Sequence, residues 1–279
     1  MHLIMIMGAL AVACWTRCQW SAPQLNWSER WQRALFSFLF PPLLIFITAI
    51  AIVCMGPQGN MSGLLTGWLS YVLALMSLAF IAILCLKLAW QGWQSVKSAR
   101  NCPLVSLAGQ QVRLLDTESL FAGQIGFWQP ELVLSQGLLQ TFTKEQLETV
   151  FAHEQGHYHY RDTFWFFWLG WVRSCTVWLP KTEALWQELL VLRELRADAH
   201  AALQVDPLLL AESLLLVVSN QPVSSEIFCA ALGSSGVDRL EQRIEALLAQ
   251  PEPIPKVQFQ FWNNFLLAFL PLVTVMFHT

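Results

Sequence analysis

Long apolar segments are the feature that most limits what this chain can fold into. A helix needs about 20 predominantly apolar residues to cross a bilayer. Only 13% of the 279 residues are charged, against roughly 25% in a typical soluble domain. Two segments are long enough, one near the N-terminus is shorter, and the last is interrupted by polar residues and a proline. We expect all four to be transmembrane helices, at residues 3–15, 34–55, 64–90 and 258–279.

The loops between these segments differ in their basic residues. Residues 56–63, between the second and third segments, contain no Lys or Arg. The loop after the first segment and residues 87–100, at and just after the end of the third, carry six basic residues: Arg17, Arg30, Arg33, Lys87, Lys97 and Arg100. Cytoplasmic loops of membrane proteins are enriched in Lys and Arg. We therefore expect residues 91–257 to face the cytoplasm from the cell inner membrane.

Cysteine usage and charge argue against a disulfide framework, a thiolate zinc site and a nucleic-acid partner. The seven cysteines are scattered and include no C-x-x-C pair, so neither a disulfide framework nor a thiolate zinc knuckle is expected. The net charge is -3 and no basic stripe occurs, so a nucleic-acid partner is not expected. The lipid bilayer is the expected surrounding, and a homodimer is left open.

Residues 91–257 form the polar part of the chain, and their pattern predicts a small α+β domain. Residues 111–115 and 124–135 are expected to be strands. Thr143 and Gln146 form a capping box, in which each side chain bonds to the backbone N–H of the other residue. The box begins a helix that runs to about residue 162, where Arg161 and Asp162 are expected to close it as a local ion pair.

More helices are expected in the second half of this domain. Residues 182–203 have helical periodicity, Asp206 and Pro207 open another helix as N-cap and first residue, and residues 239–248 form one more. Residues 164–180 are aromatic and apolar, but they are few and an arginine lies in their middle. We expect this segment to form a helix that is half-inserted in the membrane or lies on its surface.

The helix that begins at the capping box carries the motif H-E-Q-G-H at residues 153–157. His153 and His157 are four residues apart, so both rings share one face of the helix and can reach a single metal ion. Glu154 lies about 100° around the helix from His153, which places its carboxylate beside the open coordination position. A carboxylate there can take a proton from a water molecule that a zinc ion has made acidic. The motif therefore predicts two zinc ligands and a catalytic base.

The alternative is that the motif holds two surface histidines of an amphipathic helix. An H-E-x-x-H pattern arises by chance in roughly one shuffled chain of this composition in 150, so the motif favours a metal site without establishing it. A catalytic zinc ion usually has three protein ligands. A third histidine six residues after the second does not supply the missing one, because that position is Thr163.

A second helix offers the third ligand. Glu194 and Asp198 are four residues apart and so share a face of the helix expected at residues 182–203. Glu194 can ligate the metal, while Asp198 can accept the outer N–H of a ligand histidine and fix its tautomer. Alone, these acids would indicate a solvated helix face with Arg193 and Arg196. After an H-E-x-x-H helix, the ligand interpretation is favoured.

Three stretches around this site resemble membrane metallopeptidases of the gluzincin type. They are Phe127–Ser135, which ends in Pro-x-hydrophobic-hydrophobic-hydrophobic-Ser, then Gly137–Leu139, and then Phe151–His157 on the capped helix. In metallopeptidases of this type an E-x-x-A-D motif follows, as it does here at Glu194–Asp198. The resemblance extends over residues 100–250 by motif and over the whole chain by layout.

Within that type, the chain resembles the peptidase family of the bacterial beta-lactam sensor-transducers more than the family of heat-shock membrane peptidases and prenyl-protein endopeptidases. The stretches 157–162 and 178–180 favour the first family, as do three spans before the domain and one after it. The sensor-transducers carry a ligand-sensing domain beyond the last span. Because this chain stops at Thr279, we expect a peptidase core without the C-terminal sensor domain.

The resemblance implies a mostly α-helical integral membrane protein, with transmembrane helices around a small α+β zincin-like domain. It implies a zinc metalloendopeptidase with one Zn²⁺ per chain, held by His153, His157 and Glu194, with Glu154 as the base and Asp198 as the supporting acid. The substrate would be a protein or peptide, in or near the membrane, or the chain itself. Two alternatives stay open: a quality-control peptidase of the heat-shock or prenyl-protein type, and a non-catalytic membrane signalling module that keeps zinc for structure.

Overall fold

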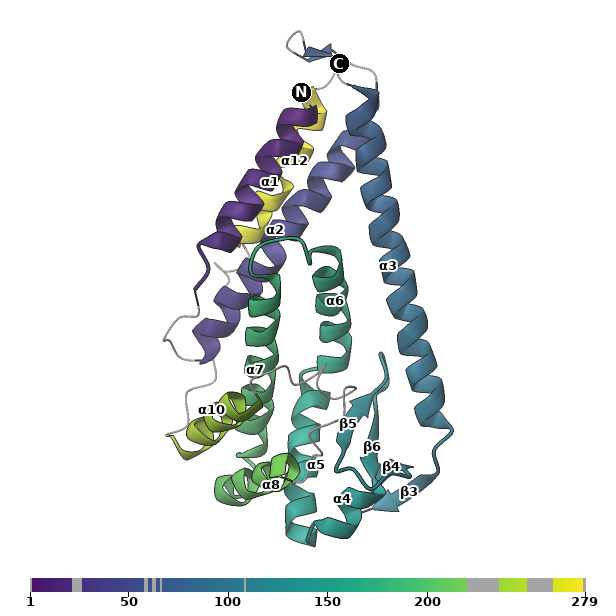
Figure 1. Ribbon diagram of the computed structural model, residues 1–279, viewed down its shortest axis with the longest axis vertical. Helices are drawn as coiled ribbons and strands as arrows, with labels where there is room; N and C mark the ends of the chain where they lie inside the picture. Colours follow the sequence, from purple (N-terminus) through teal and green to yellow (C-terminus); the bar gives the residue numbers. More distant parts are fainter. Residues whose placement is uncertain are drawn as a thin grey trace. The chain divides into compact units, whose positions relative to one another are not determined.

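The computed structural model describes residues 2–21, 27–57, 60–61, 64–65, 67–107, 109–219, 236–249 and 263–277 (Figure 1). The chain divides into two compact units. One, called here the apolar unit, comprises Met1–Leu88, Leu169–Leu189 and Ile254–Thr279. The other, the sheet unit, comprises Ala89–Trp168 and Leu190–Pro253, and every residue of the predicted site belongs to it.

The apolar unit begins with helices α1 (His2–Cys18) and α2 (Trp27–Met55), which pack against each other. A hairpin of two short strands, β1 (Asn60–Met61) and β2 (Leu64–Leu65), comes before the long helix α3 (Trp68–Arg100). The third helix therefore begins at Trp68, later than predicted, because the residues before it pair as a hairpin.

The C-terminal segment of the apolar unit is helical but irregular. It consists of η2 (Asn264–Phe269), α12 (Leu270–Val273) and η3 (Thr274–Phe277), and it packs on α2. The proline in the first turn of α12 has no N–H, so the helical hydrogen-bond pattern is interrupted there. This interruption separates α12 from the 3₁₀ turn before it.

Two helices among the described residues are long and apolar enough to cross a membrane, at Glu29–Met55 and Trp68–Arg100. Helix α1 has 17 residues and the C-terminal apolar segment is shorter still, so both fall below the length of a full span. Length and composition thus support the membrane expectation for two of the four predicted spans.

A buried arginine accompanies the two prolines inside α2. Pro42 has no N–H, so the carbonyl of Phe38 loses its helical hydrogen-bond partner. Arg17 Nη2 donates to that carbonyl at 3.0 Å, and Arg17 Nη1 donates to Thr182 Oγ1 at 3.2 Å. The Arg17 side chain is fully buried. Pro42 is tolerated because a neighbouring side chain satisfies the carbonyl that it frees.

The sheet unit is built on four strands in the order β3-β4-β6-β5. They are β3 (Leu104–Leu107), β4 (Gln110–Leu115), β5 (Ala122–Ile125) and β6 (Glu131–Ser135). Strands β4 and β6 are parallel, and the other neighbours are antiparallel. Strand β5 is therefore an edge strand of this sheet.

The single strand predicted at residues 124–135 is wrong, because two antiparallel strands, β5 and β6, occupy this stretch. The turn between them contains Gly126 with φ of 137°. A Cβ atom there would lie only 2.8 Å from the carbonyl oxygen of Gln129. Glycine accepts this backbone conformation and close approach, so the chain can reverse direction.

Strand β6 leads directly into helix α4 (Gln136–Thr141). Ser135 Oγ caps this helix by accepting from the N–H of Leu138 at 3.2 Å, and it also accepts from the N–H of Phe121 at 2.9 Å. A Cβ atom on Gly137 would lie 2.0 Å from the carbonyl oxygen of Glu118, so only glycine fits. The serine and glycine of the motif therefore join strand, helix and the preceding loop.

Helix α5 (Lys144–His159) begins at the predicted capping box, which is confirmed. The N–H of Gln146 donates to Thr143 Oγ1 at 3.3 Å, and Gln146 Oε1 accepts from the N–H of Thr143 at 3.0 Å. The helix ends at His159 because Arg161 has φ of 53°, which is not helical. Helix α6 (Asp162–Cys175) begins immediately afterwards.

Three further helices are α7 (Thr182–Ala201), α8 (Pro207–Ser219) and α10 (Gly236–Leu248). Helices α5, α7, α8 and α10 share one core cluster, to which they contribute the buried side chains of Ala152, Ala201, Leu210 and Leu247 respectively. This cluster holds the C-terminal part of α7, and with it α10, beside the H-E-x-x-H segment of α5.

Candidate metal centre

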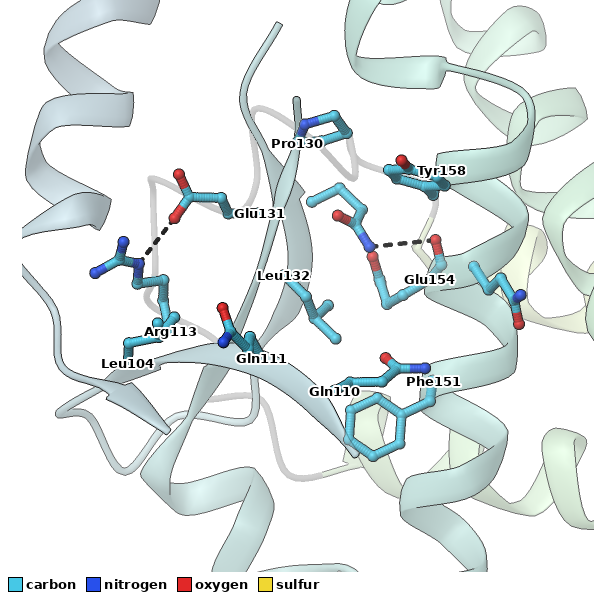
Figure 2. A pocket seen from close by; sticks show the side chains of 12 residues that line it. Leu104, Gln110, Gln111, Arg113, Pro130, Glu131, Leu132, Phe151, Glu154 and Tyr158 are labelled. Carbon is cyan, nitrogen blue, oxygen red and sulfur yellow. Dashed lines mark hydrogen bonds and ion pairs between the residues drawn. The ribbon is translucent and has the colours of Figure 1, made fainter. Parts of the chain in front are cut away.

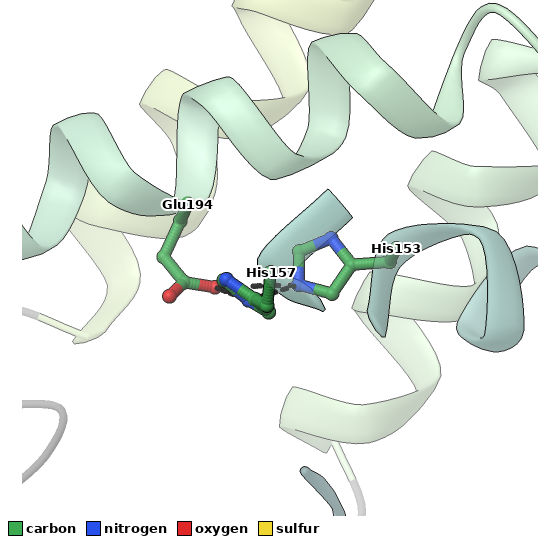
Figure 3. A group of neighbouring side chains, drawn as sticks. All are labelled: His153, His157 and Glu194. Carbon is green, nitrogen blue, oxygen red and sulfur yellow. Dashed lines mark hydrogen bonds and ion pairs between the residues drawn. The ribbon is translucent and has the colours of Figure 1, made fainter. Parts of the chain in front are cut away.

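His153 and His157 lie on one face of α5, as their spacing predicts (Figure 3). Their Nε2 atoms are 3.1 Å apart. The two rings are perpendicular, with centroids 4.7 Å apart. Both side chains are largely buried. Two ring nitrogens this close together are directed at one shared position.

Glu194 on α7 turns a carboxylate oxygen toward the same position (Figure 3). Its Oε2 atom is 3.4 Å from His153 Nε2 and 3.8 Å from His157 Nε2. Ligands about 2.0–2.1 Å from a tetrahedral ion lie about 3.4 Å from one another. The observed separations of 3.1, 3.4 and 3.8 Å therefore fit one ion between the three groups. Two imidazoles and a carboxylate are a donor set that suits zinc.

Gly156 allows α5 and α7 to approach closely. A Cβ atom on Gly156 would lie 3.0 Å from both the Cα and the carbonyl oxygen of Ala197. Gly156 lies next to His157, and Ala197 lies between Glu194 and Asp198. The contact therefore sets the distance between the histidines and the carboxylate. The H-E-x-x-H pattern treats this position as variable, so the sequence did not single it out.

Each histidine has a carboxylate beside its second ring nitrogen. His153 Nδ1 is 2.8 Å from Asp198 Oδ1, so the structure brings Asp198 beside a histidine of the candidate metal centre. His157 Nδ1 is 2.7 Å from Asp162 Oδ2. Both carboxylates are almost completely buried. A carboxylate in this position fixes the tautomer of the ring and leaves the Nε2 lone pair directed at the metal.

Asp162 does not form the local ion pair with Arg161 that the sequence predicts. Asp162 is paired instead with His157 and with Arg196 of α7. A sequence signal existed, since Asp162 follows His157 by five residues, just past the end of the helix. Because α5 ends earlier than predicted, the chain turns and carries this carboxylate back to the histidine.

Arg243 is a further residue of the site that the sequence did not indicate. It lies on α10 and donates to both oxygens of Asp198, from Nε at 2.7 Å and from Nη2 at 2.8 Å. Its Nη1 is 3.5 Å from Glu194 Oε2. Arg193 forms an ion pair with the other oxygen of Glu194, with Nη2 2.7 Å from Oε1. This leaves Oε2 as the oxygen that faces the histidines.

The charges around the histidines favour a cation between them. Burial by itself lowers the pKa of His157, but the charge of Glu194 together with hydrogen bonds to Asp162 and Glu194 raises it to about 10. Burial also acts to lower the pKa of His153, but the charge of Asp198 together with hydrogen bonds to Asp198 and Glu194 raises it overall. Burial raises the pKa of Glu194, yet Arg193 and His157 bring it well below its usual range. The carboxylates stay ionised and attract positive charge to the Nε2 atoms.

Glu154 lies beside this site on α5. It is buried, and its Oε2 atom has no hydrogen-bond partner among the described residues. Its backbone carbonyl accepts from Gln124 Nε2 of the edge strand β5 at 3.4 Å. Leaving a buried carboxylate oxygen without a partner costs about 1–3 kcal/mol or more. Such an oxygen is suited to bind a water molecule or a group of a substrate.

Two cavities adjoin Glu154. One, of about 570 Å³, lies between the sheet and α5, and Figure 2 shows Glu154 and Tyr158 across it from Leu132 and Glu131. The other, of about 440 Å³, is lined by the metal-site side chains and, across from them, by apolar side chains that include Leu214 of α8. Glu154 is thus accessible from a polar hollow and from an apolar one.

Comparison with known proteins supports a peptidase. Residues 105–191, a little under a third of the chain, match Peptidase family M48. The matched stretch contains His153, Glu154 and His157, and it ends just before Glu194. No curated protein and no solved structure matches the chain. The match does not confirm the resemblance to the beta-lactam sensor-transducers. The region around the H-E-x-x-H helix is thus similar to a family of metal-dependent peptidases, and three of its side chains can hold the metal.

Proposed function

We propose that this chain is an integral-membrane zinc metalloendopeptidase. One observation carries the proposal: three ligand atoms are separated as around one tetrahedral ion, next to a buried carboxylate oxygen that has no partner among the described residues. The match to Peptidase family M48 supports a metallopeptidase. Zinc as the metal, cleavage within peptide chains and the membrane location are the parts that we add.

The residues divide the chemistry between them. A zinc ion held by His153, His157 and Glu194 would acidify a water molecule and polarise the scissile carbonyl. Glu154 accepts the proton of the attacking water and passes it to the leaving amine. Asp198 keeps the ring of His153 in the orientation that directs its Nε2 atom at the metal.

Two features near the site suit a peptide substrate. Strand β5 is at the edge of the sheet, so its free backbone groups can pair with an extended peptide as an added strand. The hydrogen bond from Gln124 to the backbone of Glu154 holds this edge next to α5. The apolar wall that includes Leu214 and Val217 suits an apolar side chain of the substrate next to the scissile bond.

The membrane location rests on the two long apolar helices. Only 11% of the most apolar stretch of α3 is buried, so most of its apolar side chains are left exposed by the described residues. In a bilayer such side chains are solvated by lipid. The distribution of basic residues favours the cell inner membrane with the sheet unit in the cytoplasm. A substrate in or near the membrane, or a second copy of this chain, follows from that location.

The two alternatives, a quality-control peptidase and a non-catalytic zinc module, have the same metal site as the sensor-transducer-like peptidase. A quality-control peptidase would cleave soluble unfolded proteins such as casein even after removal of the spans. The sensor-transducer-like interpretation predicts a narrow set of membrane-bound regulators. A non-catalytic zinc module would not require the buried, unpartnered carboxylate of Glu154, so this residue favours an enzyme over a structural site.

The test is Glu154→Gln, which keeps the shape of the side chain and removes the base. We expect one zinc per chain to remain bound, while products of proteolysis disappear from the membrane proteome of cells that carry the variant. The matched control is Glu148→Gln, the same change at an exposed position of α5 away from the cavities, which should leave both zinc and cleavage unchanged. Unchanged cleavage products in the Glu154→Gln cells would refute the peptidase.

A further inference from the structure

A cluster of aromatic side chains lies in the sheet unit, apart from the metal ligands. We call it the aromatic patch: Phe127, Trp128, Phe164, Trp165, Phe167 and Trp168. The ring centroid of Phe127, in the β5–β6 turn, is 4.8 Å from that of Phe164 and 5.1 Å from that of Phe167 on α6. The turn and the start of α6 thus form one continuous aromatic surface.

The tryptophans of the patch are exposed. Trp128 is 71% exposed, Trp165 is 56% exposed and Trp168 is 36% exposed. The indole N–H groups of Trp128 and Trp165 make no hydrogen bond with any described residue. An exposed group of large aromatic side chains marks an interaction surface. Tryptophans that combine an apolar ring with an unpaired N–H are typical of the interface between lipid and water.

A positive charge lies at the border of the patch. Arg161 is exposed and immediately precedes α6, three residues before Phe164 and four before Trp165. A hollow of about 560 Å³ is lined by Arg161, Phe127, Trp128, His159 and His200, and no Asp or Glu is among its described lining residues. A surface of aromatic rings bordered by a cation is complementary to anionic lipid headgroups.

We propose that the aromatic patch and Arg161 bind the headgroup region of a lipid bilayer. The tryptophans lie among the lipid carbonyls and Arg161 contacts the phosphates. The proposal rests on the membrane location given under the proposed function. It adds that the unit with the metal site has its own lipid contact, through the turn that follows the edge strand β5. Helix α6 continues from the patch to Cys175, whose segment belongs to the apolar unit.

The experiment uses the full chain reconstituted in vesicles of phosphatidylcholine and phosphatidylglycerol that carry a traceable tail. Benzoylphenylalanine replaces Trp128 or Trp165, which keeps an aromatic ring in the patch. The control position is Leu208 on α8, which is 64% exposed and is not part of the aromatic patch. After irradiation we expect lipid adducts at positions 128 and 165 at several times the yield at position 208.

Two outcomes would overturn the proposal: equal lipid yields at positions 128 and 208, or adducts at position 128 with protein instead of lipid, whether a peptide or a second copy. The contribution of charge is tested with Arg161→Asn, since asparagine tolerates the positive φ of this position. We expect a lower lipid yield at position 128 in vesicles that contain phosphatidylglycerol. An unchanged yield would remove Arg161 from the surface.

The formation of lipid adducts should not depend on whether the protein is catalytically active. The adducts are measured again with Glu154→Gln, and the yields at positions 128 and 165 should not change. If cleavage is unaffected by Glu154→Gln while the adducts form, the proposed function fails and the lipid surface stands. If cleavage is lost and no adducts form, the lipid surface fails alone.

Discussion

In the apolar unit the fully buried Arg17 is bonded to neutral oxygens, whereas in the sheet unit the largely buried Arg243 and Arg196 are bonded to carboxylates. Arg17 donates to the Phe38 carbonyl and the Thr182 hydroxyl. Arg243 and Arg196 donate to Asp198 and Asp162. The first arrangement supplies a hydrogen bond to the carbonyl of α2 that Pro42 leaves without its helical partner. The second places carboxylates beside two histidines.

This difference separates a structural charge from a functional one. Buried ion pairs contribute little to stability, because removing both charges from water costs about as much as their attraction returns. The network around His153 and His157 is therefore weak evidence for stability and better evidence for binding a cation. Arg17, in contrast, compensates for a missing backbone hydrogen bond. Changes in the two units should consequently affect different measurements.

The largest effect is expected for Glu194→Ala. It removes the proposed third ligand and leaves two histidines, so zinc affinity should fall by more than the roughly 10–100-fold that loss of an outer hydrogen-bond partner causes. Metal analysis of the purified protein should show less than one zinc per chain. Glu183→Ala, an exposed carboxylate on the same helix, is the control and should keep the metal. One zinc per chain in both variants would remove Glu194 from the ligand set.

A smaller loss of zinc affinity is expected for Asp162→Asn. Asparagine keeps the shape but weakens the hydrogen bond to His157 Nδ1, so the affinity should fall about 10–100-fold. Competition with a zinc chelator measures this change. Asp116→Asn, at an exposed loop position, should have no effect. If both variants bind zinc as the unmodified protein does, Asp162 does not support the metal site.

Arg17→Met tests the structural role of the buried arginine in the apolar unit. It leaves the Phe38 carbonyl without a donor, and one unsatisfied buried polar group costs about 1–3 kcal/mol. Thermal unfolding in detergent should show the loss of stability, while zinc affinity stays the same.

Pro42→Ala supplies the missing N–H, so the double variant Arg17→Met with Pro42→Ala should regain part of that stability. A double-mutant cycle measures the coupling between the two positions. Additive effects would show that Arg17 does not act through the interrupted helix.

The smallest effect is expected for Thr143→Ala. It removes the side-chain cap of α5 and should lower the free energy of unfolding by about 1 kcal/mol. Lys144→Ala, the exposed first residue of the same helix, is the control for thermal unfolding. Zinc affinity should be unchanged in both variants. A large loss of zinc in Thr143→Ala would mean that the start of α5 positions His153 and His157, so that stability and metal binding are not separate.

The elements predicted correctly depend on neighbours in the sequence. The capping box of Thr143 and Gln146 forms from residues three apart, and the shared face of His153 and His157 follows from a spacing of one helical turn. The incorrect predictions involve changes of direction. Gly126 divides the strand predicted at residues 124–135, and the conformation of Arg161 ends α5 early. Composition does not show where a backbone adopts a positive φ.

The sequence by itself determined the apolar segments, the helix with its two histidines and Glu154, and the pairing of Glu194 with Asp198 on one face of a second helix. Each of these follows from short-range periodicity. The tertiary structure alone decided how the helices meet. The contact of Gly156 with Ala197 sets the distance between histidines and carboxylate, and α10 brings Arg243 to Asp198. Such contacts join residues far apart in the chain, and their geometry depends on packing that no local spacing records.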